Sequence, residues 1–349
     1  MHFRHAMQLA CASAIAFAAS SSAMAQAPAD GAFKGKTVTI YVGGTAGGGI
    51  DIGARMMARY MGPHLPGHPN VVVQTMPGAG GVRLMEYLNS VAVKDGTALG
   101  AFATGPILQP LIGARAVKYK MTDYPAIGAI EKDNSFCTTW HASPVKTYED
   151  VLKRETSVAG TGAASTTDIF PVVLNAVLGT KFKVITGYLG TQETIMAVER
   201  GETDGRCGWG WSSLKSSKPD WLRDKKLNFI LQLGLTKNPE LKDVPLALDM
   251  AKTEEGKQML RVIFAPQATT RPYFAPPGTP PERVEELRSA FIAALKSPGA
   301  VSEMKKIFGE EPDPTPGAEM QKILAEIYAT PEPVIAKLKK IIAEGTKGN

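Results

Sequence analysis

The segment from residue 37 to 51 reads TVTIYVGGTAGGGID and constrains the fold more than any other part of the chain. Its first six residues alternate β-branched and aromatic side chains, which predicts a strand over 37–42. Apolar residues then recur at helical spacing from Ile52 to Tyr60, which predicts a helix. The glycines between them permit positive φ and close approach by a ligand. Such a turn before a helix N-terminus presents free N–H groups and partial positive charge to an anion.

A second loop of the same kind, PGAGG at 77–81, follows the apolar strand NVVVQTM. A third small-residue loop lies in SVAGTGAASTTD, where the polar residues suit the N-cap of the next helix; these are Ser165, Thr166, Thr167 and Asp168. Strand and helix patterns alternate along most of the chain, which predicts an α/β fold of mostly parallel sheets flanked by helices. The repeated loops predict a cleft that binds an anion.

The first 25 residues carry Arg4, then an apolar run, then small residues up to Ala25. This order predicts a cleavable secretory signal over 1–25, with cleavage before Gln26, and therefore a periplasmic location. The apolar run is too short to span a membrane permanently. Removing 25 of the 349 residues leaves 324, which is enough for two domains of ordinary size.

The formal net charge is +6, and it falls to +5 without the signal because Arg4 is the only charged residue lost. Basic and acidic residues are interspersed, with no basic stripe that interleaves aromatic residues. We therefore expect no nucleic-acid partner. The mild basicity fits weak attraction of anions, and an ordinary solvated surface is the simpler explanation.

The glycine loop at 43–49 differs from nucleotide-binding motifs. It lacks the Lys-Ser/Thr ending of a P-loop, and its glycines do not fit G-x-G-x-x-G. A Pro-Gly pair separates His64 from His68 and breaks the helix that would align them on one metal. Ser165 lies outside a G-x-S-x-G elbow. The sequence thus predicts no catalytic residues, no metal and no cofactor.

Two cysteines remain after removal of the signal, Cys137 and Cys207. An even number in an oxidising compartment favours a disulfide. Two buried free thiols are the alternative, because cysteine is a common apolar filler.

Three tryptophans, Trp140, Trp209 and Trp211, accompany the strands predicted around the two cysteines, and the last two share a face by period two. One or more of them could stack on an aromatic ligand or cover an aliphatic one. Packing in the core is the alternative, and the sequence favours it slightly for each tryptophan taken singly.

The order of the motifs resembles a known family. The matching segments are VGGTAGGGIDIGAR, MPGAGG, DGTALG, GTGAASTTD, GYLGTQETIMAVERGETD, YFAPPGTP and TPGAEMQKIL. Together they span nearly the whole mature chain and resemble the secreted solute-binding proteins of tripartite tricarboxylate transporters, the Bug family. No single segment is highly specific, whereas the ordered set is.

The resemblance implies a two-lobed periplasmic-binding fold that closes on its ligand like a flytrap. Lobe 1 would comprise residues 33–134 plus 270–349, and lobe 2 residues 135–269. Hinge crossings would lie near 133–136 and 270–273. In this topology the first strand after the crossing lies beside the third strand of lobe 2, so the sulfurs of Cys137 and Cys207 would meet.

Relatives hold a ligand carboxylate through backbone amides, hydroxyls and bridging waters rather than through an arginine. In lobe 1 the matching positions are Thr45, Ala46, Gly47, Gly48, Gly49, Ala79, Gly80, Gly81, Thr104 and Gly105. In lobe 2 they are Thr161, Ser165, Thr166 and Thr167, flanked by Tyr188 and Thr191. The negative charges of Asp51 and Asp168 suit fixing the loops rather than binding a carboxylate. Many relatives carry a histidine near Asp168, and its absence here implies a different distal end of the pocket.

The resemblance therefore implies a monomeric, non-enzymatic protein that captures a small organic carboxylate and delivers it to membrane permease subunits. Dicarboxylic, tricarboxylic and aromatic acids are all candidate ligands. Presentation of the ligand to a membrane receptor or kinase is one alternative. A periplasmic hydrolase or isomerase on the same fold is another, less favoured one.

Overall fold

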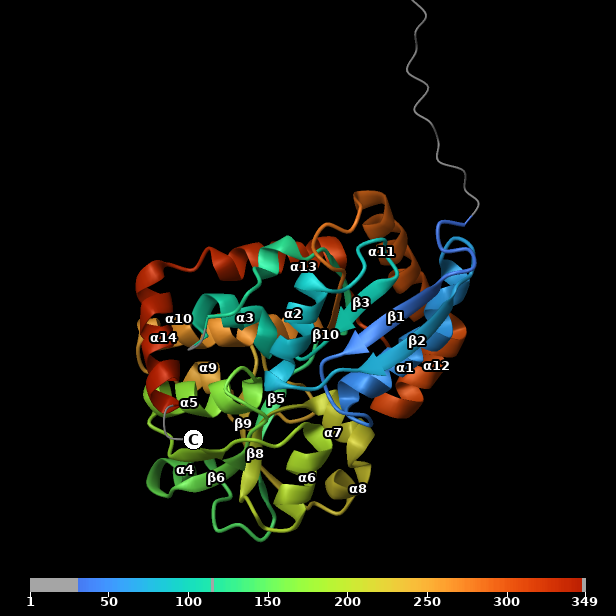
Figure 1. The fold of residues 1–349 in the computed structure, drawn as a ribbon. Coiled ribbons are helices and arrows are strands. Elements are labelled where there is room, and N and C mark those ends of the chain that lie inside the picture. The colour runs from blue at the N-terminus through green and yellow to red at the C-terminus, as the bar shows by residue number, and fades with distance from the viewer. Residues whose placement is uncertain (1–30, 114–115, 347–349) are drawn as a thin grey trace, which may run out of the picture.

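The computed structural model describes residues 31–113 and 116–346, so the predicted signal over 1–25 lies outside the described residues. Two sheets form the framework, each with helices packed on it (Figure 1). The six-stranded sheet has the order β11-β4-β10-β3-β1-β2, and with its helices it forms the first lobe. The five-stranded sheet has the order β7-β6-β8-β5-β9 and belongs to the second lobe.

Elements of the first lobe come from both ends of the chain. Its strands are β1 (Thr37–Val42), β2 (Asn70–Thr75), β3 (Ala98–Ala101), β4 (Ala126–Glu131), β10 (Thr270–Phe274) and β11 (Thr315–Pro316). Its helices are α1 (Gly49–Met61), α2 (Val82–Ser90), α3 (Gly105–Ile112), α11 (Pro281–Lys296), α12 (Pro298–Phe308) and α13 (Gly317–Tyr328). Short 3₁₀ turns are η1 (Gly62–His64), η2 (Ala79–Gly81) and η3 (Met121–Asp123).

The second lobe is built mainly from the middle of the chain. Its strands are β5 (Ser135–Trp140), β6 (Thr156–Ala159), β7 (Phe182–Ile185), β8 (Gly205–Gly210) and β9 (Leu227–Leu233). Its helices are α4 (Tyr148–Lys153), α5 (Thr166–Leu178), α6 (Thr191–Glu199), α7 (Trp211–Ser217), α8 (Pro219–Arg223), α9 (Ala247–Met250) and α10 (Glu254–Phe264). The turn η4 (Ala265–Thr269) leads back to the first sheet, and α14 (Glu332–Gly345) is the last helix.

The predicted two-lobed α/β fold is confirmed, and both sheets are mixed rather than mostly parallel. Strand β1 pairs in parallel with β2 and β3, and β6 pairs in parallel with β7 and β8. The pairs made by β10, β11 and β5 are antiparallel. Parallel neighbours need a crossover connection, usually a helix. The chain passes from β4 directly to β5 and re-enters the first sheet at β10, so these strands oppose their neighbours.

The boundaries of most elements follow the sequence patterns, with three exceptions. The segment GPILQPLI forms α3, although its glycine and its two prolines predict turns. The helices α7 and α8 are too short to show an amphipathic period. Trp211 begins α7 instead of continuing the strand that contains Trp209.

Cys137 on β5 and Cys207 on β8 form a disulfide, which confirms the predicted pairing. The tryptophans near them lie in a hydrophobic core under α6 and α7; its largest buried members are Phe136, Trp209, Trp211 and Trp221. Trp140 is partly buried against the same core. No tryptophan lines the cleft described below, so the core-packing interpretation holds for all three.

Helix α14 runs alongside α3 and down to α5 and α10 (Figure 1). Its apolar side chains, among them Ile335 and Leu338, belong to the same core as Val173 and Leu260 of the second lobe. The C-terminal helix therefore packs on α5 and α10 of the second lobe and also on α3 of the first.

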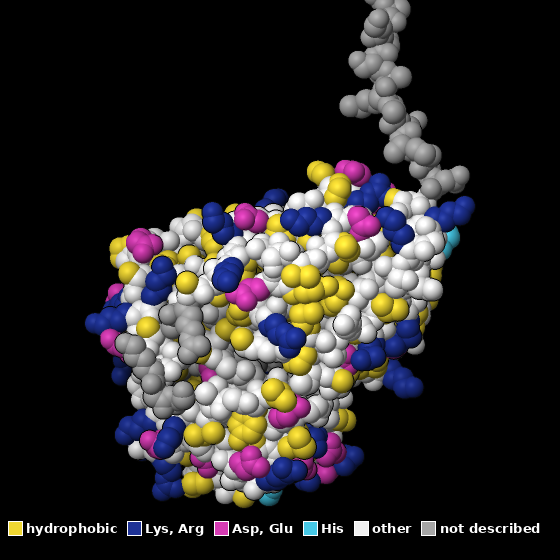
Figure 2. Space-filling view, viewed as in Figure 1, with side chains coloured by type: hydrophobic (Ala, Val, Ile, Leu, Met, Phe, Trp, Pro, Cys, Tyr) yellow, Lys and Arg dark blue, Asp and Glu magenta, His cyan; other side chains and the backbone are white. Residues whose placement is uncertain are grey.

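Charged side chains of both signs are spread over the face seen in Figure 2, with apolar groups between them. Within residues 31–113 and 116–346, no helix has both the length and the apolar character that crossing a bilayer requires.

Candidate functional site

A cleft between the two lobes is lined by the N-terminal ends of five helices. The residues concerned are Gly49 and Ile50 of α1, Thr104 before α3, Ser165, Thr166 and Thr167 at α5, Thr191 of α6, and Ser212 and Ser213 of α7. The cleft has a volume of about 940 Å³, which includes the open space at its mouth. The first N–H groups of a helix have no acceptor within that helix, and the helix dipole adds partial positive charge. In α7 these groups already have acceptors, since the N–H of Trp211 donates to the carbonyl of Asn134 and that of Ser212 to Asp133 Oδ2. The other four ends around the cleft favour an anion.

Asp51 fixes the first glycine loop. Its carboxylate accepts from the backbone N–H of Gly47 and from Nε of Arg55, each at 2.9 Å, and the side chain is buried. The carboxylate thus holds the loop from behind and does not line the cleft.

Asp168 has the same position in the second lobe. Its Oδ1 accepts from the N–H of Gly162 at 3.0 Å and from the hydroxyls of Ser165 and Thr167 at 3.1 Å. Thr167 Oγ1 also accepts from the N–H of Thr161 at 2.9 Å. The hydroxyls of this loop therefore bond largely to one another, which holds the start of α5 in place.

Nine of the sixteen expected ligand-binding residues line the cleft. They are Gly49, Gly80, Gly81, Thr104, Thr161, Ser165, Thr166, Thr167 and Thr191. The seven that do not are Thr45, Ala46, Gly47, Gly48, Ala79, Gly105 and Tyr188.

Several residues outside the lining join the two lobes at the mouth of the cleft. Gln192 Nε2 donates to the carbonyl of Gly47 over 2.7 Å. A Cβ on Gly105 would lie 2.5 Å from the carbonyl oxygen of Ala164, so only glycine permits this approach. Tyr188 makes no such bridge, because its hydroxyl donates to Glu202 of the same lobe at 3.2 Å.

Two arginines line the cleft, although the family resemblance implies none. Arg271, on the crossing strand β10, is buried and forms an ion pair with Glu131 at the end of β4. It donates from Nε to the carbonyl of Gly49 at 2.9 Å and from Nη2 to Ser212 Oγ at 3.0 Å. Its φ of +54° is rare for a residue with a side chain, and the surrounding contacts must hold it there. Arg271 therefore ties α1 and α7 to the crossing strand.

Asp133 completes this polar network at the crossing between the lobes. The hydroxyl of Ser212 lies 2.5 Å from Glu131 Oε1 and 2.7 Å from Asp133 Oδ2. A hydroxyl has one proton to donate, so the second short contact requires a proton on a carboxyl group. Burial of the carboxyl group raises the pKa of Asp133 to about 7, which fits that requirement.

Arg206, on β8, is the second arginine of the lining, and it has no acidic partner. Its side chain is 5% exposed, and its guanidinium carbon lies 5.0 Å from the centre of the Trp209 ring. Nε and Nη1 are buried without a hydrogen-bond partner. Burial lowers the pKa of Arg206 to about 9, with no opposing contribution from a nearby charge.

Arg206, Arg271, Asp133 and Ser212 are the lining residues that sequence reasoning missed and that carry most of the charge and polarity. One signal for Arg206 was present: an arginine inside the apolar strand pattern of DGRCGWGW needs either solvent or a partner. The other three become neighbours only through the crossing of β4 and β10, which the sequence pattern does not bring together.

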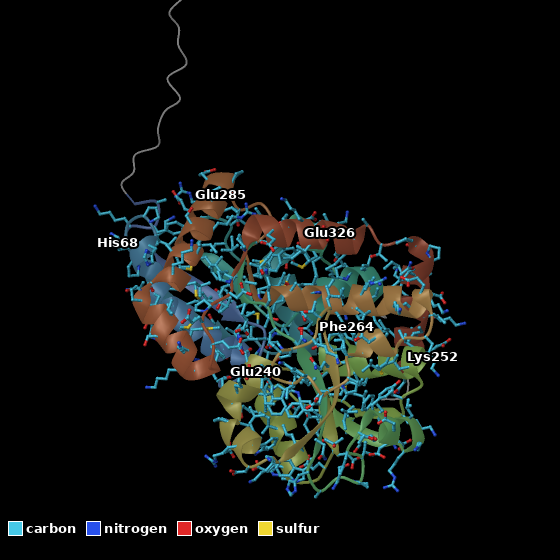
Figure 3. The ribbon with its side chains drawn as sticks, turned by 180° about the vertical axis from the view of Figure 1, so that it is seen from behind. His68, Glu240, Lys252, Phe264, Glu285 and Glu326 are labelled. Carbon is cyan, nitrogen blue, oxygen red and sulfur yellow. A yellow bond between two sulfur atoms is a disulfide. The ribbon has the colours of Figure 1, made fainter. Side chains whose placement is uncertain are left out.

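In the described ranges, no group of three or more His, Cys, Asp or Glu residues has the arrangement of a metal site. His68 lies at the outer end of the first lobe, remote from the crossing between the lobes (Figure 3).

Two α/β lobes that face one another across a cleft of helix N-termini define the class: the chain has the two-lobed fold of periplasmic binding proteins. No family model matches the sequence. Its structural neighbours are BugD, TctC and related binding proteins of the tripartite tricarboxylate type, so the resemblance stated from the motifs is confirmed in the fold.

The similarity extends over nearly the whole chain. A curated relative, "UPF0065 protein in the TAR-I ttuE-ttuC' intergenic region" of Agrobacterium vitis, is 27% identical over 337 residues, 92% of this chain and 88% of the relative. The periplasmic binding protein BugD superposes with a TM-score of 0.65 at 19% identity, over 88% of this chain and 97% of BugD.

Two solved structures contain a carboxylate. MatC (Rpa3494) from Rhodopseudomonas palustris with bound malate has a TM-score of 0.68 at 20% identity, over 88% of this chain and 98% of MatC. R. palustris Rpa4515 with adipate has a TM-score of 0.66 at 19% identity, over 88% and 97% of the two chains.

Proposed function

We propose that this protein is a non-enzymatic member of the Bug family that captures a small organic carboxylate between its lobes and delivers it to a membrane permease. The convergence of the N-termini of α1, α3, α5 and α6 on one cleft is the observation that carries the proposal. The malate in MatC and the adipate in Rpa4515 support a carboxylate as ligand.

Binding exchanges the hydration of the anion for fixed hydrogen bonds. The donors are the first amides of α1, α3, α5 and α6 and the hydroxyl of Thr166, with Asp51 and Asp168 keeping the loops in position. Each charge-assisted bond contributes about 1.5–3 kcal/mol, so a handful reach micromolar affinity after the cost of closure.

Closure would bend the segments that connect the sheets, near 133–136 and 270–273. The direct passage from β4 to β5 and the return at β10 support these two hinges. We assign residues 33–134 and 270–328 to lobe 1 and 135–269 to lobe 2. We assign α14 to lobe 2, because it packs on both α5 and α10 there, and its contact with α3 would then lie between the lobes.

A thermal-shift screen of the mature protein, from Gln26 to the C-terminus, against a library of mono-, di-, tri- and aromatic carboxylates tests the proposal. A ligand at 100 times its dissociation constant stabilises a protein by about 2.7 kcal/mol, which is a clear shift. Neutral amides of the same acids are the control. A library without a single stabilising acid, or turnover of a bound acid, would count against a carboxylate-binding protein.

Secretion as a soluble monomer and delivery to a permease are parts of the same proposal. The neighbours are periplasmic binding proteins, which fits a periplasmic location. Deleting the gene should abolish uptake of the acid that the screen identifies while leaving its metabolism inside the cell intact. Unchanged uptake together with a lost transcriptional response would favour a sensor instead.

A further inference from the structure

Arg206 is a buried cation that the described structure leaves without a counter-charge. Among the described residues its guanidinium makes no ion pair, and Nε and Nη1 have neither solvent nor an acceptor. A charge removed from water is costly unless an opposite charge or hydrogen-bond acceptors replace the lost hydration. The other buried arginine of the cleft, Arg271, has Glu131 as its partner. Arg206 is therefore the residue whose charge needs a partner from outside the described residues.

The position of Arg206 directs its guanidinium to the cleft. Its guanidinium carbon lies over the ring of Trp209, three residues further along, so the side chain extends toward the carboxyl end of β8. At that end Gly208 and Gly210 line the cleft together with Arg206 itself. A Cβ on Gly208 would lie 3.0 Å from the backbone of Thr166, so this strand end adjoins the start of α5.

The stacking on Trp209 orients the planar guanidinium. Trp209 is 2% exposed and packs edge-to-face against Trp221, so its ring cannot turn freely. The fixed ring therefore limits where the guanidinium can lie, and two parallel N–H groups on one edge of a guanidinium match the two oxygens of a carboxylate.

We propose that Arg206 binds a second anionic group of the ligand, so that the cleft selects dicarboxylates over monocarboxylates. This inference rests on the proposed function, and it assigns the first carboxylate to the amides of the helix N-termini. Those amides hold one anionic group without a basic side chain, which leaves the charge of Arg206 for another.

Calorimetric titration of the mature protein with paired ligands tests the proposal. The probes are the linear dicarboxylates from succinate to pimelate, each compared with its monomethyl ester, which keeps the length and loses one charge. The wild type should bind at least one diacid 30-fold or more tightly than its half ester. Arg206→Met should weaken that diacid about 30-fold and change the half ester by less than threefold, so the ratio collapses.

Two further variants separate ligand recognition from structure. Arg206→Lys keeps the charge without the planar fork and should fall between the wild type and Arg206→Met for the diacid alone. Arg200→Met removes an exposed arginine from the same lobe and should leave both ligands unchanged. In the absence of ligand, Arg206→Met should melt at or above the wild-type temperature, because it removes an unpaired buried charge. If Arg206→Met does not fold, the affinities of Arg206→Lys for the diacid and its half ester test the proposal instead.

Each outcome has one meaning. The role of Arg206 in selecting the second anionic group is overturned if Arg206→Met keeps the wild-type ratio of diacid to half-ester affinity. Equal weakening of both ligands has the same meaning. Wild-type affinities for diacid and half ester within threefold of one another overturn this inference and leave the proposed function standing. A wild type that binds no acid of any length in the series or in the wider library overturns both.

Discussion

Arg271 donates from Nε to the carbonyl oxygen of Gly49 over 2.9 Å, which joins the crossing strand β10 to the first turn of α1. The two residues are 222 positions apart in the chain. The side chain of Arg271 fits here because glycines of α1 have no Cβ to clash with it. A Cβ on Gly53, one turn further along α1, would lie 2.9 Å from Cδ of Arg271 and 3.2 Å from Cδ1 of Ile130.

Gly53→Ala should therefore destabilise the protein, although alanine is the better helix former. Alanine gains about 1 kcal/mol over glycine in a helix interior. Overpacking against a side chain pinned by its hydrogen bonds costs about 1–3 kcal/mol. We expect a net loss of up to about 2 kcal/mol in the free energy of unfolding, measured in urea. Gly44→Ala is the matched control, since its Cβ would meet nothing within 4 Å. A stabilised Gly53→Ala variant would show that Arg271 moves freely.

The disulfide predicts a large stability difference between oxidised and cysteine-free protein. Cys137 and Cys207 are 70 residues apart, and closing a loop of that length in the unfolded chain accounts for about 4 kcal/mol in the chain-entropy model. The double variant Cys137→Ala/Cys207→Ala should lose about 2–4 kcal/mol of unfolding free energy. Thiol titration of the unfolded, unreduced mature chain should find no free thiol, and two after reduction. Two thiols before reduction would show that the pair stays reduced in the secreted protein.

The sequence predicts the parts of the site that are local. Glycine loops, helix starts and the acids that fix them lie within a few residues of one another, so the position of Gly80 or Asp168 follows from its own segment. The polar network of Arg271, Glu131 and Ser212 does not, because it forms where three distant segments meet. No periodicity in any one of those segments contains that information.

Arg206 is an intermediate case. Its burial could be inferred from the apolar strand around it, whereas the lack of a partner depends on every element that packs nearby. Helix α3 was missed for a related reason: it is mostly buried, and a helix that is apolar nearly all round carries little amphipathic period. Thr45 and Tyr188, expected at the ligand, instead bond Glu193 and Glu202, because the turn geometry that aims them is set by tertiary contacts.

Asp133 predicts a pH dependence of stability. Its pKa rises from 3.8 to about 7 on folding, so the folded state holds a proton that the unfolded state releases. This contribution to stability is fully present below pH about 4 and is lost as the pH rises through about 7. Asp133→Asn removes the titration while keeping an acceptor for Ser212. The stability of the wild type relative to Asp133→Asn should fall between pH 4 and 7, measured by urea unfolding across that range. A constant difference between the two proteins would mean that Asp133 titrates normally.

Thr166→Ala should weaken ligand binding without weakening the fold. Its side chain lines the cleft, and in the described residues its hydroxyl makes no hydrogen bond. Removing one hydrogen bond to a charged group should raise the dissociation constant about 10- to 100-fold. Thr167→Ala is the contrasting variant, because Thr167 Oγ1 bonds Thr161, Ser165 and Asp168. It should lower the melting temperature as well. A Thr166→Ala variant with unchanged affinity would remove the start of α5 from the binding site.

Lys215 of α7 lies between two acids, one from each lobe. Its Nζ is 3.0 Å from Glu240 of the second lobe and also forms an ion pair with Glu310, which follows α12 of the first lobe. Glu240 lies at the boundary between the lobes in Figure 3. Because opening of the cleft would separate Lys215 from Glu310 and leave its pair with Glu240 intact, this contact should favour the closed state.

Glu310→Gln should therefore shift the protein toward the open state and weaken binding of any cleft ligand. Partly exposed ion pairs contribute up to about 1 kcal/mol, which corresponds to about a fivefold rise in the dissociation constant. The effect should shrink as salt is added, because screening weakens the pair in the wild type. Glu311→Gln is the matched control: Glu311 pairs with Lys305 inside the first lobe, and opening does not break that pair. Calorimetry at low and high salt on both variants gives the comparison. If Glu310→Gln and Glu311→Gln bind the ligand equally well, the Lys215–Glu310 pair does not favour the closed state. Closure then depends on the ligand and on the loops at the mouth.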